Sequence, residues 1–162
     1  MNNQEFYLSD AIEVIEEILE SGGEFRLYPR GTSMLPLIVQ SRDSVALCRT
    51  QGVSAQKGDI AFYKRSDGHF VLHRVMDVCA DGTYVMCGDN QTLLERGIRS
   101  EQILARVCAV YRREKRIEVD SRAYRTYVFL WARMPLRRVL LFVYRAFAKL
   151  SRIFRRILRR SS

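Results

Sequence analysis

The 162-residue chain has few of the residues that hold metal ions or cofactors. Its four cysteines lie far apart, no C-x-x-C pair occurs, and the only histidines are His69 and His73. Structural zinc sites usually combine four Cys or His ligands, often in close pairs, so the sequence predicts no metal and no cofactor. Scattered cysteines also favour a reducing, cytoplasmic setting.

Long apolar runs are also missing. The longest uncharged ones cover residues 126–132 and 139–144, well short of the roughly 20 residues that span a bilayer. Residues 1–21 show no basic start followed by an apolar run, so we expect no signal peptide. The chain also lacks a phosphate-binding glycine loop, a zinc-protease helix and a nucleotide-binding fingerprint.

Acidic residues are absent from one part of the chain. Residues 121–162 hold 12 of the 27 basic residues and none of the 18 acidic ones. The net charge of +9 therefore hides a mildly acidic body and a strongly basic tail. We expect three parts: an N-terminal amphipathic helix (1–23), a catalytic β domain (24–120) and a basic amphipathic tail (121–162).

The first part shows helical periodicity. Apolar residues recur three or four positions apart, with glutamates opposite, at Leu8, Ile12, Ile15, Ile18 and Leu19. Asp10 and Glu13 have the spacing of a capping box, and the glycines at 22 and 23 are typical of a helix end. We predict an amphipathic helix packed on the body.

The second part predicts a mainly β (α+β) body. Apolar β-rich runs alternate with Gly, Asp and Ser turns, which is typical of an antiparallel coiled sheet or barrel-like fold. The predicted strands cover residues 25–28, 44–49, 59–63, 69–78, 83–86, 103–111 and 116–119.

The tail predicts a second amphipathic helix. On a helical wheel, one face collects Leu136, Val139, Leu140, Val143, Phe147, Leu150, Phe154, Ile157 and Leu158. The opposite face collects Arg137, Arg138, Arg145, Lys149, Arg152, Arg155, Arg156 and Arg159. With Tyr127 and Trp131 near its start, this pattern favours a helix lying on an anionic membrane surface through residues 124–160. Packing on the body or on a partner is the alternative; nucleic-acid binding is less favoured, because such arms rarely carry a full apolar face.

Three short stretches could carry chemistry. Ser33 lies in a Gly- and Pro-bounded loop, residues 28–38, that could hold a hydroxyl at a fixed point or be an ordinary turn. His73 could act as its base or be a packed histidine; His69, four positions away on a strand, is about 13 Å off, too far to share a metal. Asp89, in the Gly-Asp-Asn turn at 88–90, could orient an imidazole.

These stretches together resemble the type I signal peptidases and LexA-type repressors. The match covers roughly residues 24–112, and its boxes occur in the family's order and spacing. They are Ser33-Met34-Leu35-Pro36 (S-M-x-P), Gly58-Asp59-Ile60 (G-D-[IV]), His73-Arg74-Val75 (H-R-V), Gly88-Asp89-Asn90 (G-D-N) and the closing segment 101–107. Most bacterial members have a lysine where His73 stands, so the chain resembles the ER-type branch with a Ser-His pair.

The resemblance implies roles for individual residues. Ser33 is expected to be the nucleophile and His73 the general base; Glu95, at the position of the branch's assisting aspartate, and Asp89 are rival candidates for orienting the imidazole. The Ser33 N–H would supply one oxyanion donor. Many relatives carry a hydroxyl where Gly31 stands, so that donor is missing or comes from Thr32. Gly31, Thr32, Met34 and Pro36 are expected to form the substrate and oxyanion region, beside a shallow apolar groove for small side chains.

The function predicted in this way is that of a serine endopeptidase that cleaves a leader or signal-like segment after small residues. Signal peptidases are normally anchored by an N-terminal transmembrane helix, whereas this chain starts with an acidic amphipathic helix and has its basic tail at the other end. We therefore expect a membrane-associated protein at the cytoplasmic face, or ordinary signal-peptide processing with unusual anchoring. The alternative is a catalytically dormant module acting as a membrane-surface adaptor. A self-cleaving regulator is disfavoured, since those proteins pair serine with lysine and carry a DNA-binding domain.

Overall fold

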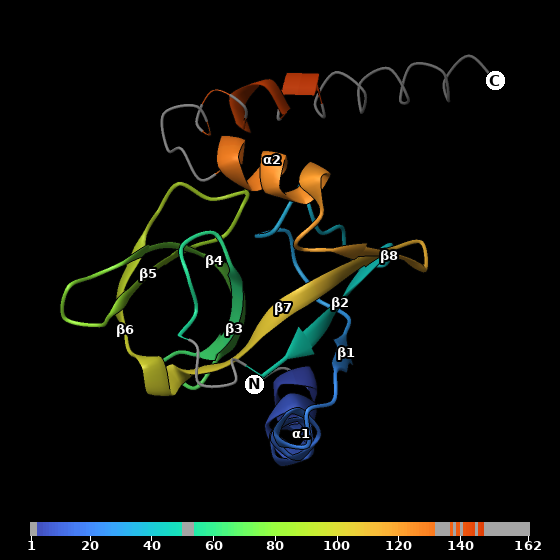
Figure 1. Ribbon diagram of the computed structural model, residues 1–162, viewed down its shortest axis with the longest axis vertical. Coiled ribbons are helices and arrows are strands. Elements are labelled where there is room, and N and C mark those ends of the chain that lie inside the picture. The colour runs from blue at the N-terminus through green and yellow to red at the C-terminus, as the bar shows by residue number, and fades with distance from the viewer. Residues whose placement is uncertain are drawn as a thin grey trace.

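The computed structural model describes residues 3–49 and 54–131, and, in the tail, residues 137, 139, 141–144, 146 and 147; the side chains of residues 3–10 are not included. Within residues 3–49 and 54–131 the elements are two α-helices, eight strands and one short 3-10 helix (Figure 1). In chain order these are α1 (Asn3–Glu20), β1 (Phe25–Leu27), β2 (Asp43–Cys48), β3 (Ile60–Lys64), β4 (Phe70–Val78), β5 (Tyr84–Cys87), β6 (Glu95–Ile98), η1 (Ser100–Gln102), β7 (Ile103–Arg112), β8 (Lys115–Glu118) and α2 (Arg122–Trp131).

The strands form one antiparallel sheet in the order β1-β2-β7-β3-β4-β5-β6, with β8 paired to β7. The long strand β7 organises it: β2 pairs along one edge, while β3 and then β8 pair along the other. Within the described residues β1 and β6 do not pair with each other, so the sheet is not closed into a barrel. The prediction of a mainly β, antiparallel body is confirmed, but the described sheet does not form a closed barrel.

All seven predicted strands are present, with ends that differ by no more than one residue. The prediction missed β6. This strand has only one buried apolar residue, Ile98, and its other side chains are charged or absent, so it lacks the alternation that marks a strand. It forms because β5 offers an edge, with Tyr84 opposite Ile98 and Met86 opposite Glu95.

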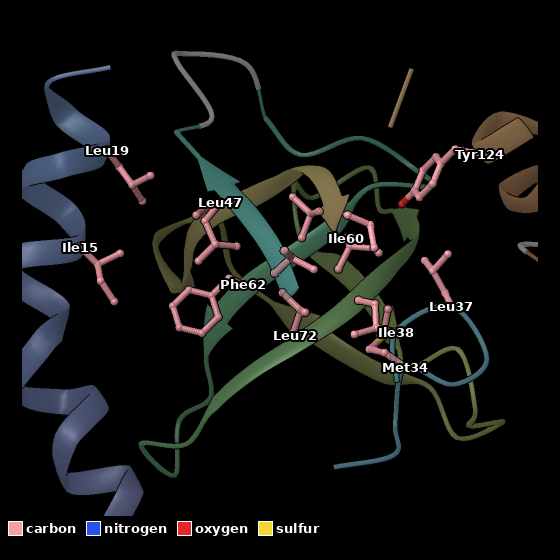
Figure 2. Close-up of a cluster of buried hydrophobic side chains, with 14 residues drawn as sticks. Ile15, Leu19, Met34, Leu37, Ile38, Leu47, Ile60, Phe62, Leu72 and Tyr124 are labelled. Atoms are coloured by element: carbon pink, nitrogen blue, oxygen red, sulfur yellow. The ribbon is translucent and has the colours of Figure 1, made fainter. Parts of the chain in front are cut away.

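Strand β3 separates two hydrophobic clusters, because successive side chains of a strand point to opposite faces. Ile60 and Phe62 belong to the larger cluster, and Ala61 and Tyr63 to the smaller one. Figure 2 shows the larger cluster between α1 on one side and Tyr124 of α2 on the other. Both helices therefore share a core with the sheet.

Helix α1 packs as predicted through its apolar face, where Ile15 and Leu19 are buried. Its end is also as predicted: Gly22 has φ +83°, and the Gly23 N–H donates to the Ile18 carbonyl at 2.9 Å. The predicted capping box is wrong. The helix begins at Asn3, so Asp10 lies within it.

In helix α2 and the residues after it, two side chains that the sequence predicted to be exposed are buried. Trp131, predicted to face a membrane, is buried, and its Nε1–H donates to the main-chain oxygen of Asp89. Tyr127 is half-buried and donates its hydroxyl to the Asp89 carboxylate. Arg137, predicted on the solvated basic face, is completely buried.

The rest of the predicted tail is only partly described. Val139, Val143 and Phe147 of the apolar face are exposed, as is Phe142. Among the described residues no helix is long and apolar enough to cross a bilayer. The other predicted residues of both faces lie outside the described part of the chain, as do Pro135 and the end of the tail.

Candidate active site

Ser33 lies in the loop between β1 and β2, which apolar side chains anchor in the core. Met34 and Ile38 are buried on the inner side of the loop, and the Ile38 N–H donates to the Met34 carbonyl at 3.0 Å. Gly31 has φ +89°, the left-handed conformation that few other residues adopt, and its N–H donates to Gln40 Oε1 at 2.9 Å. The loop is thus fixed on both sides of a half-buried serine.

The turn after β5 attaches this loop to the sheet. The Asn90 N–H donates to the Ser33 carbonyl at 2.7 Å, and Asn90 Nδ2 donates to the Thr32 carbonyl at 3.0 Å. A Cβ atom at Gly88 would lie 2.7 Å from Ser33 O, closer than real Cβ atoms come to other atoms, and 3.0 Å from His73 Nε2, which is unusually tight. A side chain at position 88 would therefore clash with the Ser33 carbonyl and crowd the His73 ring.

His73 is buried on β4, and its ring points to the side of the sheet that Tyr63 occupies. Its Nδ1 is 3.0 Å from Glu95 Oε1 and 3.3 Å from the Tyr63 hydroxyl oxygen. An Nδ1–H that donates to Glu95 leaves Nε2, on the Gly88 side, as the proton acceptor. Burial lowers the pKa of His73 below its ordinary value of 6.5, although the Glu95 charge opposes this, so the ring is neutral near pH 7.

Glu95 is held by two further side chains. Arg65 donates to both carboxylate oxygens, with Nε at 2.7 Å from Oε2, and the Tyr63 hydroxyl donates to Oε2 at 3.0 Å. Burial raises the pKa of Glu95, but these hydrogen bonds outweigh it and the pKa ends below its ordinary value. The carboxylate beside His73 is therefore ionised at neutral pH.

Asp89, the rival candidate, faces a different partner. Its carboxylate accepts two hydrogen bonds from Arg74, at 2.8 and 2.6 Å, and both side chains are completely buried. The Tyr127 hydroxyl donates to the same carboxylate at 3.0 Å. Of the two carboxylates, Glu95 is the one in contact with His73 Nδ1.

A groove of about 120 Å³ lies beside part of the predicted oxyanion and substrate region. Gly31, Ser33 and Met34 line it, whereas Thr32 and Pro36 do not. The remaining lining residues are mainly apolar: Pro29, Arg30, Ile38, Gln40, Phe70, Val71 and Leu72. Among the described residues, neither the Ser33 hydroxyl nor its N–H makes a hydrogen bond, so the side chains of Ser33 and His73 are not joined.

Sequence reasoning missed Tyr63 and Arg65. Tyr63 lies on β3 and Arg65 directly follows the end of that strand, and both donate hydrogen bonds to Glu95 of β6. The sequence predicts that β3 is a strand. It does not predict that β3 pairs with β4, which places Ala61 opposite His73. No local signal connects these residues to the site.

No group of three or more His, Cys, Asp or Glu side chains could hold a metal ion in the described part of the chain. Comparison with models of known families, with curated proteins and with solved structures finds no match to this chain. The site is therefore interpreted from its own residues and from the motifs that they form.

Proposed function

We propose that the protein is a serine endopeptidase of the signal peptidase type, with Ser33 as nucleophile and His73 as general base. The observation that carries the proposal is the arrangement around His73: the ionised carboxylate of Glu95 contacts Nδ1, and Gly88, on the Nε2 side, packs against the Ser33 carbonyl. This is the arrangement of a nucleophile, a base and an orienting acid, recognised by geometry and role.

The proposed reaction has two steps. His73 Nε2 takes the proton of Ser33 Oγ as this oxygen attacks the scissile carbonyl, and the imidazolium then gives that proton to the leaving amine, which forms an acyl-enzyme. Water, deprotonated by the same nitrogen, hydrolyses the ester and restores the serine. Glu95 stabilises the imidazolium, and the Ser33 N–H is the candidate oxyanion donor. The serine must rotate into contact with His73, as catalytic hydrogen bonds often tighten only with substrate bound.

The substrate proposed is an extended polypeptide in the groove. Residues 70–72 of β4 pair with β3 on one edge, and within the described chain no strand pairs with their other edge. The groove lies between this edge and Ser33, so a peptide strand could add there by main-chain hydrogen bonds. A groove of about 120 Å³ suits small side chains, in line with the family resemblance.

The test compares protein N-termini in the native host between wild type, Ser33→Ala and His73→Ala, with His69→Ala as the control for losing the other histidine. New termini after small residues should appear with wild type and the control, and disappear in both site variants. Identical termini in all four strains, with each protein folded and abundant, would instead favour the dormant adaptor.

We further propose that the tail binds the anionic lipid of the cytoplasmic membrane face. Two features support this: the exposed apolar side chains at its start, Phe129, Leu130, Val139, Phe142, Val143 and Phe147, and the 12 basic residues without an acid in residues 121–162. The purified protein should sediment with vesicles containing phosphatidylserine and less with phosphatidylcholine alone, and Phe142→Ser with Phe147→Ser should weaken binding. Equal behaviour on both lipids, or no effect of the double variant, argues against this surface, and protease accessibility of the body from outside the cell argues against the cytoplasmic face.

A further inference from the structure

Three side chains from α2 and the residues after it converge on the turn that carries Gly88 and Asp89. Tyr127 and Trp131 stack with ring centroids 5.2 Å apart; the Tyr127 hydroxyl donates to the Asp89 carboxylate and Trp131 Nε1–H to the Asp89 main-chain oxygen, at 3.0 and 2.8 Å. Arg137 donates through Nη2 to the Gly88 carbonyl. Figure 1 shows α2 at the end of the sheet opposite α1.

Arg137 is an unusual residue to use for packing. It is completely buried, with Nη1 3.3 Å from Met76 Sδ and Nη2 3.9 Å from Asp89 Oδ1, whose carboxylate already pairs with Arg74. Removing an arginine charge from water is costly, and an apolar residue of similar volume would usually stabilise such a site as well or better. What an arginine adds is a directed donor, and here the donor meets the carbonyl of Gly88.

The position of that carbonyl matters for Ser33. Gly88 packs against both the Ser33 carbonyl and His73 Nε2, and Asn90, two residues on, donates to the Ser33 and Thr32 carbonyls. Hydrogen bonds therefore connect Arg137 and Trp131 to residues 88–90, and residues 88–90 to the serine loop. A shift of the turn would move the Ser33 backbone relative to the base.

We propose that Arg137, assisted by Trp131, is a positioning residue that fixes the turn at residues 88–90 and, through Asn90, holds Ser33 in register with His73. This role rests on the proposed peptidase function. It makes the C-terminal part of the chain a component of the active-site scaffold in addition to any role in membrane binding. The expected defect is in the chemical step, because Met76, Gly88 and Asp89, which Arg137 contacts, do not line the groove.

The first test measures hydrogen exchange in the full-length protein without lipid. Arg137→Met removes the donors at nearly constant length, and Arg99→Met removes the same charge from an exposed arginine whose side chain is 74% exposed. Exchange of the Asn90 amide, which donates to Ser33 O, should be at least about tenfold faster in Arg137→Met. The amides between β2 and β7 should be unchanged. If the Asn90 amide exchanges equally in both variants, Arg137 does not hold the turn and the proposal is overturned.

The second test measures cleavage of a peptide that spans a site found by the comparison of N-termini. Arg137→Met should lower kcat by about tenfold with KM nearly unchanged, and Arg137→Lys, which keeps one charged donor, should recover part of kcat. Trp131→Phe, which removes the donor to Asp89 O and part of the ring stacked on Tyr127, should give a smaller loss. Faster exchange at Asn90 with normal kcat would overturn the positioning role. If wild type shows no Ser33-dependent cleavage, the proposed function fails, and the exchange result alone decides whether Arg137 fixes the turn.

Discussion

His73 and Arg74 are neighbours in the chain, yet they belong to two different electrostatic networks. Because their side chains point to opposite faces of β4, His73 contacts Glu95 and Arg74 contacts Asp89. The Glu95 side chain is 23% exposed and has Arg65 and Tyr63 as further donors. The Asp89 side chain is completely buried, beneath Tyr127 and Trp131.

The two networks differ in what they can do. Burial lowers the pKa of Arg74, but the Asp89 charge outweighs this and raises it, so the guanidinium stays charged at every relevant pH. A guanidinium that is always charged can hold its neighbours in place but cannot take up or release a proton. His73 can, because its neutral imidazole has an acceptor nitrogen, Nε2, and lies beside an ionised carboxylate. The comparison predicts that Asp89 matters mainly for folding and Glu95 mainly for the reaction.

The largest effect on stability is expected from Asp89→Asn. It keeps the shape but leaves the completely buried Arg74 without a counter-charge, so the free energy of unfolding should fall by about 3–5 kcal/mol. Denaturant unfolding measures this. The control is Asp77→Asn, which breaks an exposed pair with Lys57 and should cost less than about 1 kcal/mol. Similar losses in the two variants would show that the Asp89 pair contributes no more than a surface one.

A smaller loss of stability and a larger loss of activity are expected from Glu95→Gln. The free energy of unfolding should fall by about 1–2 kcal/mol, because a neutral amide replaces the charged acceptor of Arg65 and Tyr63 at a partly exposed site. The Glu95 charge raises the pKa of His73, so its removal should move that pKa further down. NMR titration of the His73 ring in the wild type and the variant measures the direction of this pKa change. An unchanged or higher pKa would mean that Glu95 does not act on the imidazole.

The smallest effect is a pH dependence of stability. The folded-state pKa of His73 is below the ordinary value of 6.5, so between these values the unfolded chain binds a proton that the folded protein does not. The contribution of His73 to the free energy of unfolding is fully present above pH 6.5. Below this pH it should fall as the pH decreases, by at most about 1.4 kcal/mol per pH unit, until the folded-state pKa is reached. Glu95, with a lowered pKa, adds its own loss only below about pH 4.5.

Denaturant unfolding from pH 7 to 5 measures this slope. His73→Gln should flatten it, and His69→Gln is the matched substitution at the other histidine. A slope that survives in His73→Gln would assign the pH dependence to other groups.

Much of the fold was predictable because its signals are local. The strands β2, β3, β4 and β7 follow runs of apolar residues, and the loop between β1 and β2 follows from Gly31 and the prolines. Strand β6 was missed, since the pairing edge of β5 and not its own residues makes it a strand. The site shows the same division: Ser33, His73, Asp89 and Glu95 could be named from motifs, but Tyr63, Arg65 and Arg137 could not.

The sequence by itself determined which residues are candidates, because nucleophile, base and acid types can be read one at a time along the chain. It also determined the charge of the tail and the end of α1 at its glycines. Only the tertiary structure decided which carboxylate meets His73, since that depends on which face of β4 the ring occupies and on β6, a strand that is not adjacent to β4 in the sheet, bringing Glu95 to that face. The burial of Trp131 and Arg137 was likewise visible only in the tertiary structure, because a helical wheel shows which side chains share a face but not which face the folded body covers.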